Sequence, residues 1–122
     1  MDKRILVVED NMLVQEVYAS ALQNLGCEVI TADDGNEALA LAEEEEPDLI
    51  IMDIMLPGVS GLDLVRKMKS DPALKDTPII VVTTMAMAAD QEKIRAAGAD
   101  GYLPKPIRVD EFTEAVRKIL EG

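Results

Sequence analysis

Short apolar runs alternate along the chain with segments in which apolar residues recur at helical spacing. The apolar runs are rich in β-branched residues and end at polar or turn residues, which is typical of strands. We expect strands at residues 5–8, 28–31, 49–52 and 79–82, and a weaker one at 101–103. The helical spacing predicts five helices, at about 13–25, from about 34, from about 60, at about 86–97 and at about 109–120.

The ends of these helices carry local signals. Gly26 and Gly98 follow the first and fourth helical segments, and glycine is common just past a helix end because it accepts a left-handed backbone. Asp34 is followed three residues later by Glu37, which predicts a capping side chain and an acid in the first turn. Ser60 opens the third helix in the same way, with an acid three residues on.

Strands that alternate with helices predict an α/β fold with a parallel sheet, because parallel strands need crossover connections. The runs 5–8, 49–52 and 79–82 are apolar throughout, as in strands that are buried on both faces. We therefore expect a five-stranded parallel sheet with these three strands in its middle and five helices on both faces. Residues 1–122 contain no repeat or linker and are expected to form one domain.

Composition narrows the classes of function. The 122 residues include 24 acidic and 12 basic side chains and no histidine, for a net charge of −12. This charge disfavours direct binding to nucleic acids and anionic membranes, and the lack of histidine excludes His-activated nucleophiles and His-ligated metals. The single cysteine, Cys27, cannot form an internal disulfide, and no apolar run approaches the roughly 20 residues of a membrane span. We expect a cytoplasmic protein.

Polar side chains follow the predicted strands where each strand ends. Glu9 and Asp10 follow the first strand, Asp53 the third, Thr83 the fourth and Lys105 the fifth. Ligands bind outside the carboxyl ends of the strands in an open parallel sheet, so we expect these residues on one rim. Singly, each has an ordinary structural explanation: an acid can cap a helix, a threonine can be a loop hydroxyl and a lysine a solvated base. Their joint occurrence favours a functional site.

Three neighbouring carboxylates repel one another, and a divalent cation with oxygen ligands removes that repulsion. Mg²⁺ characteristically uses one or two protein carboxylates together with phosphate oxygens. One acid can then attack a phosphoryl group and form an acyl phosphate, while a hydroxyl and a lysine neutralise the transferred group. The rim residues therefore predict phosphoryl chemistry that depends on Mg²⁺.

Four motifs together resemble a bacterial response-regulator receiver domain: Val8-Glu9-Asp10-Asn11, Met52-Asp53-Ile54-Met55-Leu56-Pro57, Thr83 and Lys105-Pro106. The resemblance covers essentially the whole chain. It implies a flavodoxin-like, doubly wound fold with strand order 2-1-3-4-5. It also implies phosphorylation by a histidine kinase or a histidine phosphotransfer protein, control of a downstream protein, Mg²⁺ with Mn²⁺ as a substitute, and a monomer or a weak phosphorylation-linked dimer.

The resemblance assigns roles to the acids of the rim. Asp53 is the expected phosphoryl acceptor, Asp10 a direct metal ligand, and Glu9 a ligand largely through water. The backbone carbonyl of Met55 is expected as a further ligand. Glu9 stands where aspartate is also frequent in the family, and its longer side chain suits a water-mediated contact.

The resemblance also implies which residues bind the phosphoryl group and which respond to it. Thr83 and Lys105 are expected to bind phosphoryl oxygens, and the bond from Lys105 to Pro106 is expected to be cis, which X-Pro bonds tolerate. Tyr102 takes the place of a switch aromatic, on an output face made by the fourth helix, the fifth strand and the fifth helix. Thr84 stands where the family usually has alanine or glycine, and its β-branched side chain crowds the approach to the acceptor.

Two other kinds of function compete with the signalling switch: an enzyme or carrier of the same architecture, and a receiver that only binds partners. An aspartate-nucleophile phosphatase of this architecture needs a second acid two residues past the nucleophile, where this chain has Met55. A flavin carrier needs aromatic rings, and the chain has two Tyr, one Phe and no Trp. The complete set of rim residues disfavours a receiver that only binds partners and accepts no phosphate.

The phosphorylated form is expected to be long-lived. In receivers, the residues two past the acceptor and two past the conserved threonine stand over the path of an attacking water. Here these residues are Met55 and Met85, whose long apolar side chains cannot orient a water by hydrogen bonding. We therefore expect a slowly resetting switch.

Overall fold

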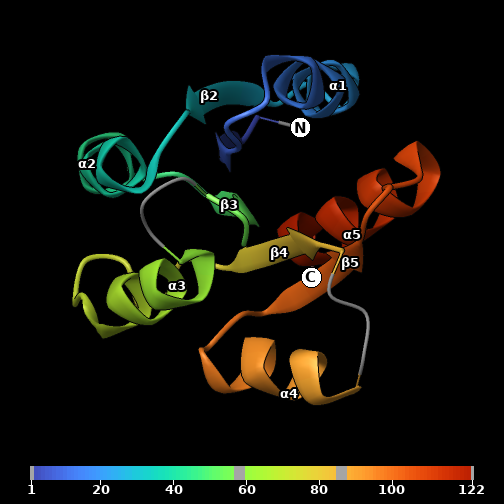
Figure 1. Cartoon of the computed structure of the whole chain (residues 1–122). Helices are drawn as coiled ribbons and strands as arrows, with labels where there is room; N and C mark the ends of the chain where they lie inside the picture. The colour runs from blue at the N-terminus through green and yellow to red at the C-terminus, as the bar shows by residue number, and fades with distance from the viewer. Residues whose placement is uncertain (1, 57–59, 85–87, 122) are drawn as a thin grey trace.

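The computed structural model describes residues 2–56, 60–84 and 88–121 (Figure 1). In this part of the chain the strands are β1 (Arg4–Val8), β2 (Glu28–Ala32), β3 (Leu49–Asp53), β4 (Ile79–Thr83) and β5 (Gly101–Pro104). The helices are α1 (Met12–Asn24), α2 (Gly35–Glu45), α3 (Gly61–Ser70), α4 (Ala88–Ala96) and α5 (Val109–Glu121). None of the helices within these ranges has both the length and the apolar character needed to cross a bilayer.

The strands form one parallel sheet in the order β2-β1-β3-β4-β5. This confirms the predicted α/β fold, the strand order and the central place of the three most apolar runs. Every residue of β3 and β4 is buried, whereas the edge strands β2 and β5 keep partial exposure. Unbroken apolar runs indicate central strands because such strands meet neighbours on both edges and helices on both faces.

Each strand is one residue longer than the apolar pattern predicts. Asp53 is the last residue of β3 and pairs with Val82, and Thr83 is the last residue of β4 and pairs with Pro104. Backbone pairing between neighbouring strands continues past the point where the side chains become polar. Asp53 and Thr83 are therefore held by the sheet itself rather than by a loop.

The helices cover both faces of the sheet, as predicted (Figure 1). Helices α1 and α5 pack on one face, where Tyr18 stacks on Phe112 with ring centroids 5.2 Å apart. Helices α2, α3 and α4 pack on the other face, where Met68 and Ile94 belong to a second core. With both faces closed, the ends of the strands are the part of the sheet left open to a ligand.

The helix ends follow the predicted signals at all but one position. Gly26 and Gly98 have positive φ angles of 82° and 106°, and Asp34 caps α2 by accepting a backbone N–H three residues on, at 2.8 Å. Ser60 makes no capping hydrogen bond with its side chain, so this part of the prediction is wrong. Ser60 has the extended backbone of an N-cap residue and forms an isolated antiparallel bridge with Met55.

The connection after β3 is shaped by the close approach of Gly61. A Cβ atom at Gly61 would lie 2.5 Å from the Cα of Ile54 and 2.6 Å from the carbonyl oxygen of Asp53. The Gly61 N–H donates to the carbonyl oxygen of Ile54 at 3.0 Å. Only glycine allows α3 to begin this close to the strand, and the start of α3 therefore supports the backbone just past Asp53.

Candidate functional site

The polar residues that follow the strands converge on one rim of the sheet. Asp53 and Thr83 end β3 and β4, while Glu9 and Asp10 follow β1 and Lys105 follows β5. These strands are consecutive neighbours in the sheet, so their carboxyl ends lie side by side. The predicted meeting of residues from distant parts of the sequence is thus confirmed.

Glu9, Asp10 and Asp53 form an acidic cluster in which one carboxylate oxygen from each residue lies within 4.8 Å of the others. Glu9 and Asp53 are only 1% and 3% exposed, whereas Asp10 is exposed. Asn11, rather than either acid before it, caps α1: its Oδ1 accepts two backbone N–H groups of the first turn at 2.9 and 3.1 Å. Helix capping therefore does not account for Glu9 and Asp10.

The chemistry of this cluster fits a small divalent cation. Carboxylate oxygens are hard ligands, and Mg²⁺ binds proteins through one or two of them while keeping places for water or phosphate oxygens. The two buried carboxylates repel each other, and the exposed Asp10 leaves the cluster accessible from solvent. The residues present therefore suit Mg²⁺.

Lys105 bridges the two buried acids. Its Nζ donates to Oε1 of Glu9 and to Oδ2 of Asp53, both at 3.1 Å. The backbone N–H of Lys105 donates to the carbonyl oxygen of the fully buried Thr83 at 2.7 Å, and the bond to Pro106 is cis as the family resemblance implies. The ammonium group of Lys105, the residue just past β5, thus lies between the buried acids of the cluster.

Burial and charge shift the pKa values of this site. Burial raises the pKa of Glu9 above its usual value, although the Asn11 backbone N–H and Lys105 act in the opposite direction. Burial alone would lower the pKa of Lys105, but hydrogen bonds to Glu9 and Asp53 and their charges outweigh it and raise that pKa. Burial, followed by the charges of the same two acids, also raises the pKa of Tyr18. Lys105 therefore stays protonated at neutral pH.

The other residues predicted around the acceptor are exposed where the structure describes them. The Met55 backbone N–H donates to Oδ1 of Asp53 at 3.1 Å, and Met55 as a whole is 66% exposed. Thr84 and Pro106 are exposed. Met85 lies outside the described residues.

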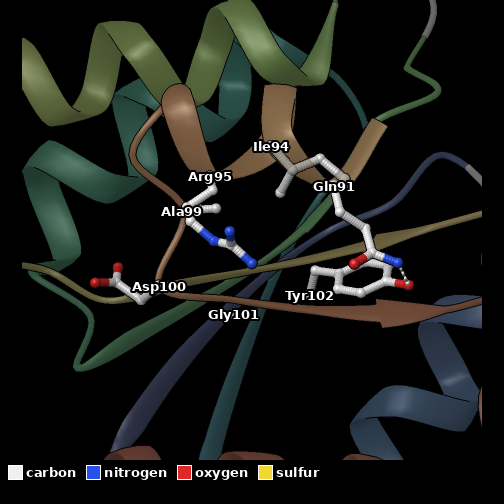
Figure 2. A pocket seen from close by; sticks show the side chains of 7 residues that line it. All are labelled: Gln91, Ile94, Arg95, Ala99, Asp100, Gly101 and Tyr102. Carbon is white, nitrogen blue, oxygen red and sulfur yellow. Dashed lines mark hydrogen bonds between the residues drawn. The ribbon is translucent and has the colours of Figure 1, made fainter. Parts of the chain in front are cut away.

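Tyr102 lies on β5 in a pocket that β5 shares with α4 (Figure 2). The side chain of Tyr102 is half-buried, and the Gln91 amide Nε2 donates to its hydroxyl at 2.9 Å, the dashed bond in Figure 2. The other lining residues are Ile94, Arg95, Ala99, Asp100 and Gly101. The expected switch residue is therefore tied to α4.

Sequence reasoning missed Gln15, a buried residue of α1. Its Nε2 donates to the carbonyl oxygen of Glu9 and to Oδ1 of Asp33. A signal was available, because position 15 is one helical turn before Tyr18 and two before Leu22, both buried on α1. A polar residue on the inward face of a helix indicates a specific hydrogen-bonding role.

Replacing Lys105 by methionine removes the positive charge between two buried carboxylates and keeps an apolar side chain of similar length. In EDTA, Lys105→Met is expected to lose about 1 to 3 kcal/mol of unfolding free energy, less than for a fully buried pair because the lysine side chain is 23% exposed. Mg²⁺ should restore more stability to the variant than to the wild type. Urea denaturation with and without Mg²⁺ measures both effects, with the exposed Lys118→Met as control. Equal stability of Lys105→Met and wild type in EDTA would contradict the bridging role.

Comparison with known proteins agrees with this geometry. The sequence pattern of the family described as "Response regulator receiver domain" matches residues 5–117. The chain is 43% identical over 120 residues to the polar-differentiation response regulator DivK of Brucella anthropi and to that of Brucella ovis, covering 98% of this chain and 98% of each relative.

Solved structures show the same likeness. The chemotaxis protein CheY4 of Vibrio cholerae superposes with a TM-score of 0.91 at 31% identity, over 98% of this chain and 99% of that one. The receiver domain of the sensor histidine kinase PA1611 from Pseudomonas aeruginosa, solved with a magnesium ion coordinated in its active site cleft, has a TM-score of 0.90 at 32% identity over the full length of both chains. Because the family pattern and the relatives agree over nearly the whole sequence, the chain belongs to the response-regulator receiver domain family of two-component signalling proteins.

Proposed function

We propose that this chain is a phosphorylation-dependent signalling switch in which residues 1–122 form one receiver domain and Asp53 accepts the phosphoryl group. The observation that carries the proposal is the Asp53 carboxylate, which is 3% exposed at the end of β3. It lies 3.1 Å from the Lys105 ammonium and within the acidic cluster. A carboxylate in this setting combines a nucleophilic oxygen with groups that can neutralise an incoming phosphoryl group.

Glu9, Asp10 and Asp53, with the backbone carbonyl of Met55, would hold Mg²⁺, and Mn²⁺ could take its place. When bound, the ion supplies neutralisation of the negative charge on the phosphoryl oxygens. Both carboxylate oxygens of Glu9 already have partners, since Oε1 accepts from Lys105 and Oε2 from the Asn11 backbone N–H, each at 3.1 Å. This supports a contact of Glu9 with the cation through water, and the magnesium ion in the Pseudomonas receiver domain supports the site.

Phosphoryl transfer to Asp53 is an exchange of two bonds. An Asp53 carboxylate oxygen forms the new bond to phosphorus while the bond from phosphorus to the donor's histidine nitrogen breaks. The imidazole nitrogen leaves with the electron pair and takes up a proton from solvent. Lys105 Nζ, now beside Asp53 Oδ2, then binds one phosphoryl oxygen, and the Thr83 hydroxyl binds another.

The partners of this reaction are proteins. The chain contains no histidine, so the phosphohistidine comes from a histidine kinase or a histidine phosphotransfer protein. The net charge of −12 favours a downstream protein over nucleic acid as the target. The chain acts as a signalling switch rather than as an enzyme, and we expect a monomer or a weak dimer that forms after phosphorylation.

Asp53 is expected to gain one phosphoryl group from acetyl phosphate, and only when Mg²⁺ or Mn²⁺ is present, because the carboxylates otherwise repel the incoming phosphate. Intact-mass spectrometry of samples with divalent cation and with EDTA measures the gain. Asp53→Asn should remain unlabelled, and Asp63→Asn, an exposed acid of α3, should label like the wild type. Equal labelling of Asp53→Asn and wild type would remove Asp53 as the acceptor.

The output surface is proposed to include α4 and β5, which meet at the hydrogen bond from Gln91 to Tyr102 (Figure 2). A phosphoryl group on Asp53 would draw the Thr83 hydroxyl toward it and open space at the end of β4. Tyr102 would turn into that space and break its bond to Gln91. The switch would thus shift an equilibrium between two arrangements of α4 against β5.

Beryllofluoride, which mimics a phosphoryl group on aspartate, is expected to shift the amide NMR signals of α4 and β5 more than those of α2. Gln91→Leu removes the bond to Tyr102, so its spectrum without beryllofluoride should move toward the bound wild-type spectrum at β5. Gln23→Leu, on an exposed part of α1, is the control. If the largest shifts away from Asp53 fall on α2, the output surface is assigned wrongly.

The phosphorylated form is proposed to decay slowly, because hydrolysis needs a water held in line with the phosphorus of phospho-Asp53. Of the two methionines expected beside that path, Met55 lies in the described part of the chain. It is exposed, and its side chain has no group that orients a water. Met55→Asn should speed phosphate release by roughly tenfold, less than the ~100-fold or more of a positioned general base. Met55→Leu, which stays apolar, should release phosphate at the wild-type rate. Phosphate release from purified phosphoprotein in Mg²⁺ measures all three, and equal decay of wild type and Met55→Asn would contradict the proposal.

A further inference from the structure

Gln15 is a buried polar side chain directly behind the acidic cluster. It lies in the first turn of α1 and is 9% exposed. Its Nε2 donates to the carbonyl oxygen of Glu9 and, at 2.7 Å, to Oδ1 of Asp33. One amide group therefore links the connection after β1 to the connection after β2.

Packing alone does not explain an amide at position 15. Gln15 shares the inward face of α1 with Tyr18 and Leu22, which belong to the core under that helix. An apolar side chain of similar length would pack there without the cost of desolvating an amide. The two hydrogen bonds, one of them to the carboxylate of Asp33, offset that cost. They point to a role in holding the groups that accept them.

The carbonyl that Gln15 holds belongs to the peptide unit that joins Glu9 to Asp10. A peptide unit is planar, so fixing its oxygen fixes the orientation of the Cα atoms on both sides. The N–H of Glu9 is also fixed, because it donates to the carbonyl oxygen of Ala32 at 3.1 Å. The side chains of Glu9 and Asp10 therefore leave the backbone in set directions toward Asp53.

We propose that Gln15 is a positioning residue for the divalent cation, holding the Glu9–Asp10 peptide against Asp33 so that both acids keep the arrangement that binds the ion. The inference rests on the proposed Mg²⁺ site. It adds that cation affinity also depends on Asp33, an exposed residue in the connection after β2. Supporting partners of metal ligands commonly contribute 10- to 100-fold to metal affinity, roughly.

Binding of Mn²⁺ to the full chain, followed by the EPR signal of free Mn²⁺ without any phosphodonor, tests the inference separately from phosphorylation. Gln15→Met keeps the length of the side chain and removes both hydrogen bonds, so Mn²⁺ affinity should fall about tenfold. Asp33→Ala changes only an exposed side chain and removes one end of the link, so affinity should fall in the same direction by less. Gln23→Met, on the same helix but exposed, should bind Mn²⁺ like the wild type.

These variants distinguish failure of the positioning role of Gln15 from failure of the proposed cation site. Wild-type affinity in both Gln15→Met and Asp33→Ala, with binding lost in Asp10→Asn, would overturn the positioning role and leave the cation site in place. Absence of Mn²⁺ binding in the wild type, or unchanged binding in Asp10→Asn, would overturn the cation site and the positioning role with it. If urea denaturation in EDTA shows that Gln15→Met does not fold, the affinity of Asp33→Ala decides.

Discussion

The carboxylates of Glu9 and Asp53 lie out of solvent beside each other, so their negative charges repel unless positive charge lies near them. Their oxygens are within 4.8 Å, a separation at which two like charges repel by about 3 kcal/mol or more at an effective dielectric of about 20. Lys105 is 3.1 Å from each, so its attraction to either acid exceeds the repulsion between them. In the proposed phosphorylation, a phosphoryl oxygen that draws Lys105 away would leave this repulsion uncompensated, which is an electrostatic reason for the proposed dependence on Mg²⁺.

The parallel sheet is what brings these charges together. Lys105 is 96 residues from Glu9 and 52 residues from Asp53 in the sequence, yet all strands point the same way and their ends meet at one rim. Two cores, one on each face of the sheet, keep the strands in register. Gly61 lets α3 begin against the end of β3, so the start of α3 supports the backbone just past Asp53. A site that depends on small distances between charges needs this rigid support.

Amide side chains organise the surroundings of the charged residues. Asn11 caps α1 and so leaves the two preceding acids free of that task. Gln15 holds the peptide between those acids, and Gln91 holds the hydroxyl of Tyr102 on the proposed output surface. Amides suit these positions because they can accept hydrogen bonds, as Asn11 does, or donate them, as Gln15 and Gln91 do, without adding or removing charge. The balance between Lys105 and the buried acids is therefore undisturbed.

Local patterns in the sequence determined the strands, the helices, the parallel sheet and the rim at which the polar residues gather, because apolar periodicity and strand ends are properties of short segments. The strand order and the residue roles came with the resemblance to receiver domains. Only the tertiary structure decided that Ser60 does not cap α3, that Lys105 bridges both buried acids, and that Gln15 joins Glu9 to Asp33. The Lys105 bridge and the bond from Gln15 to Asp33 depend on where the sheet and helices place atoms that are distant in the sequence, and no short segment carries that information.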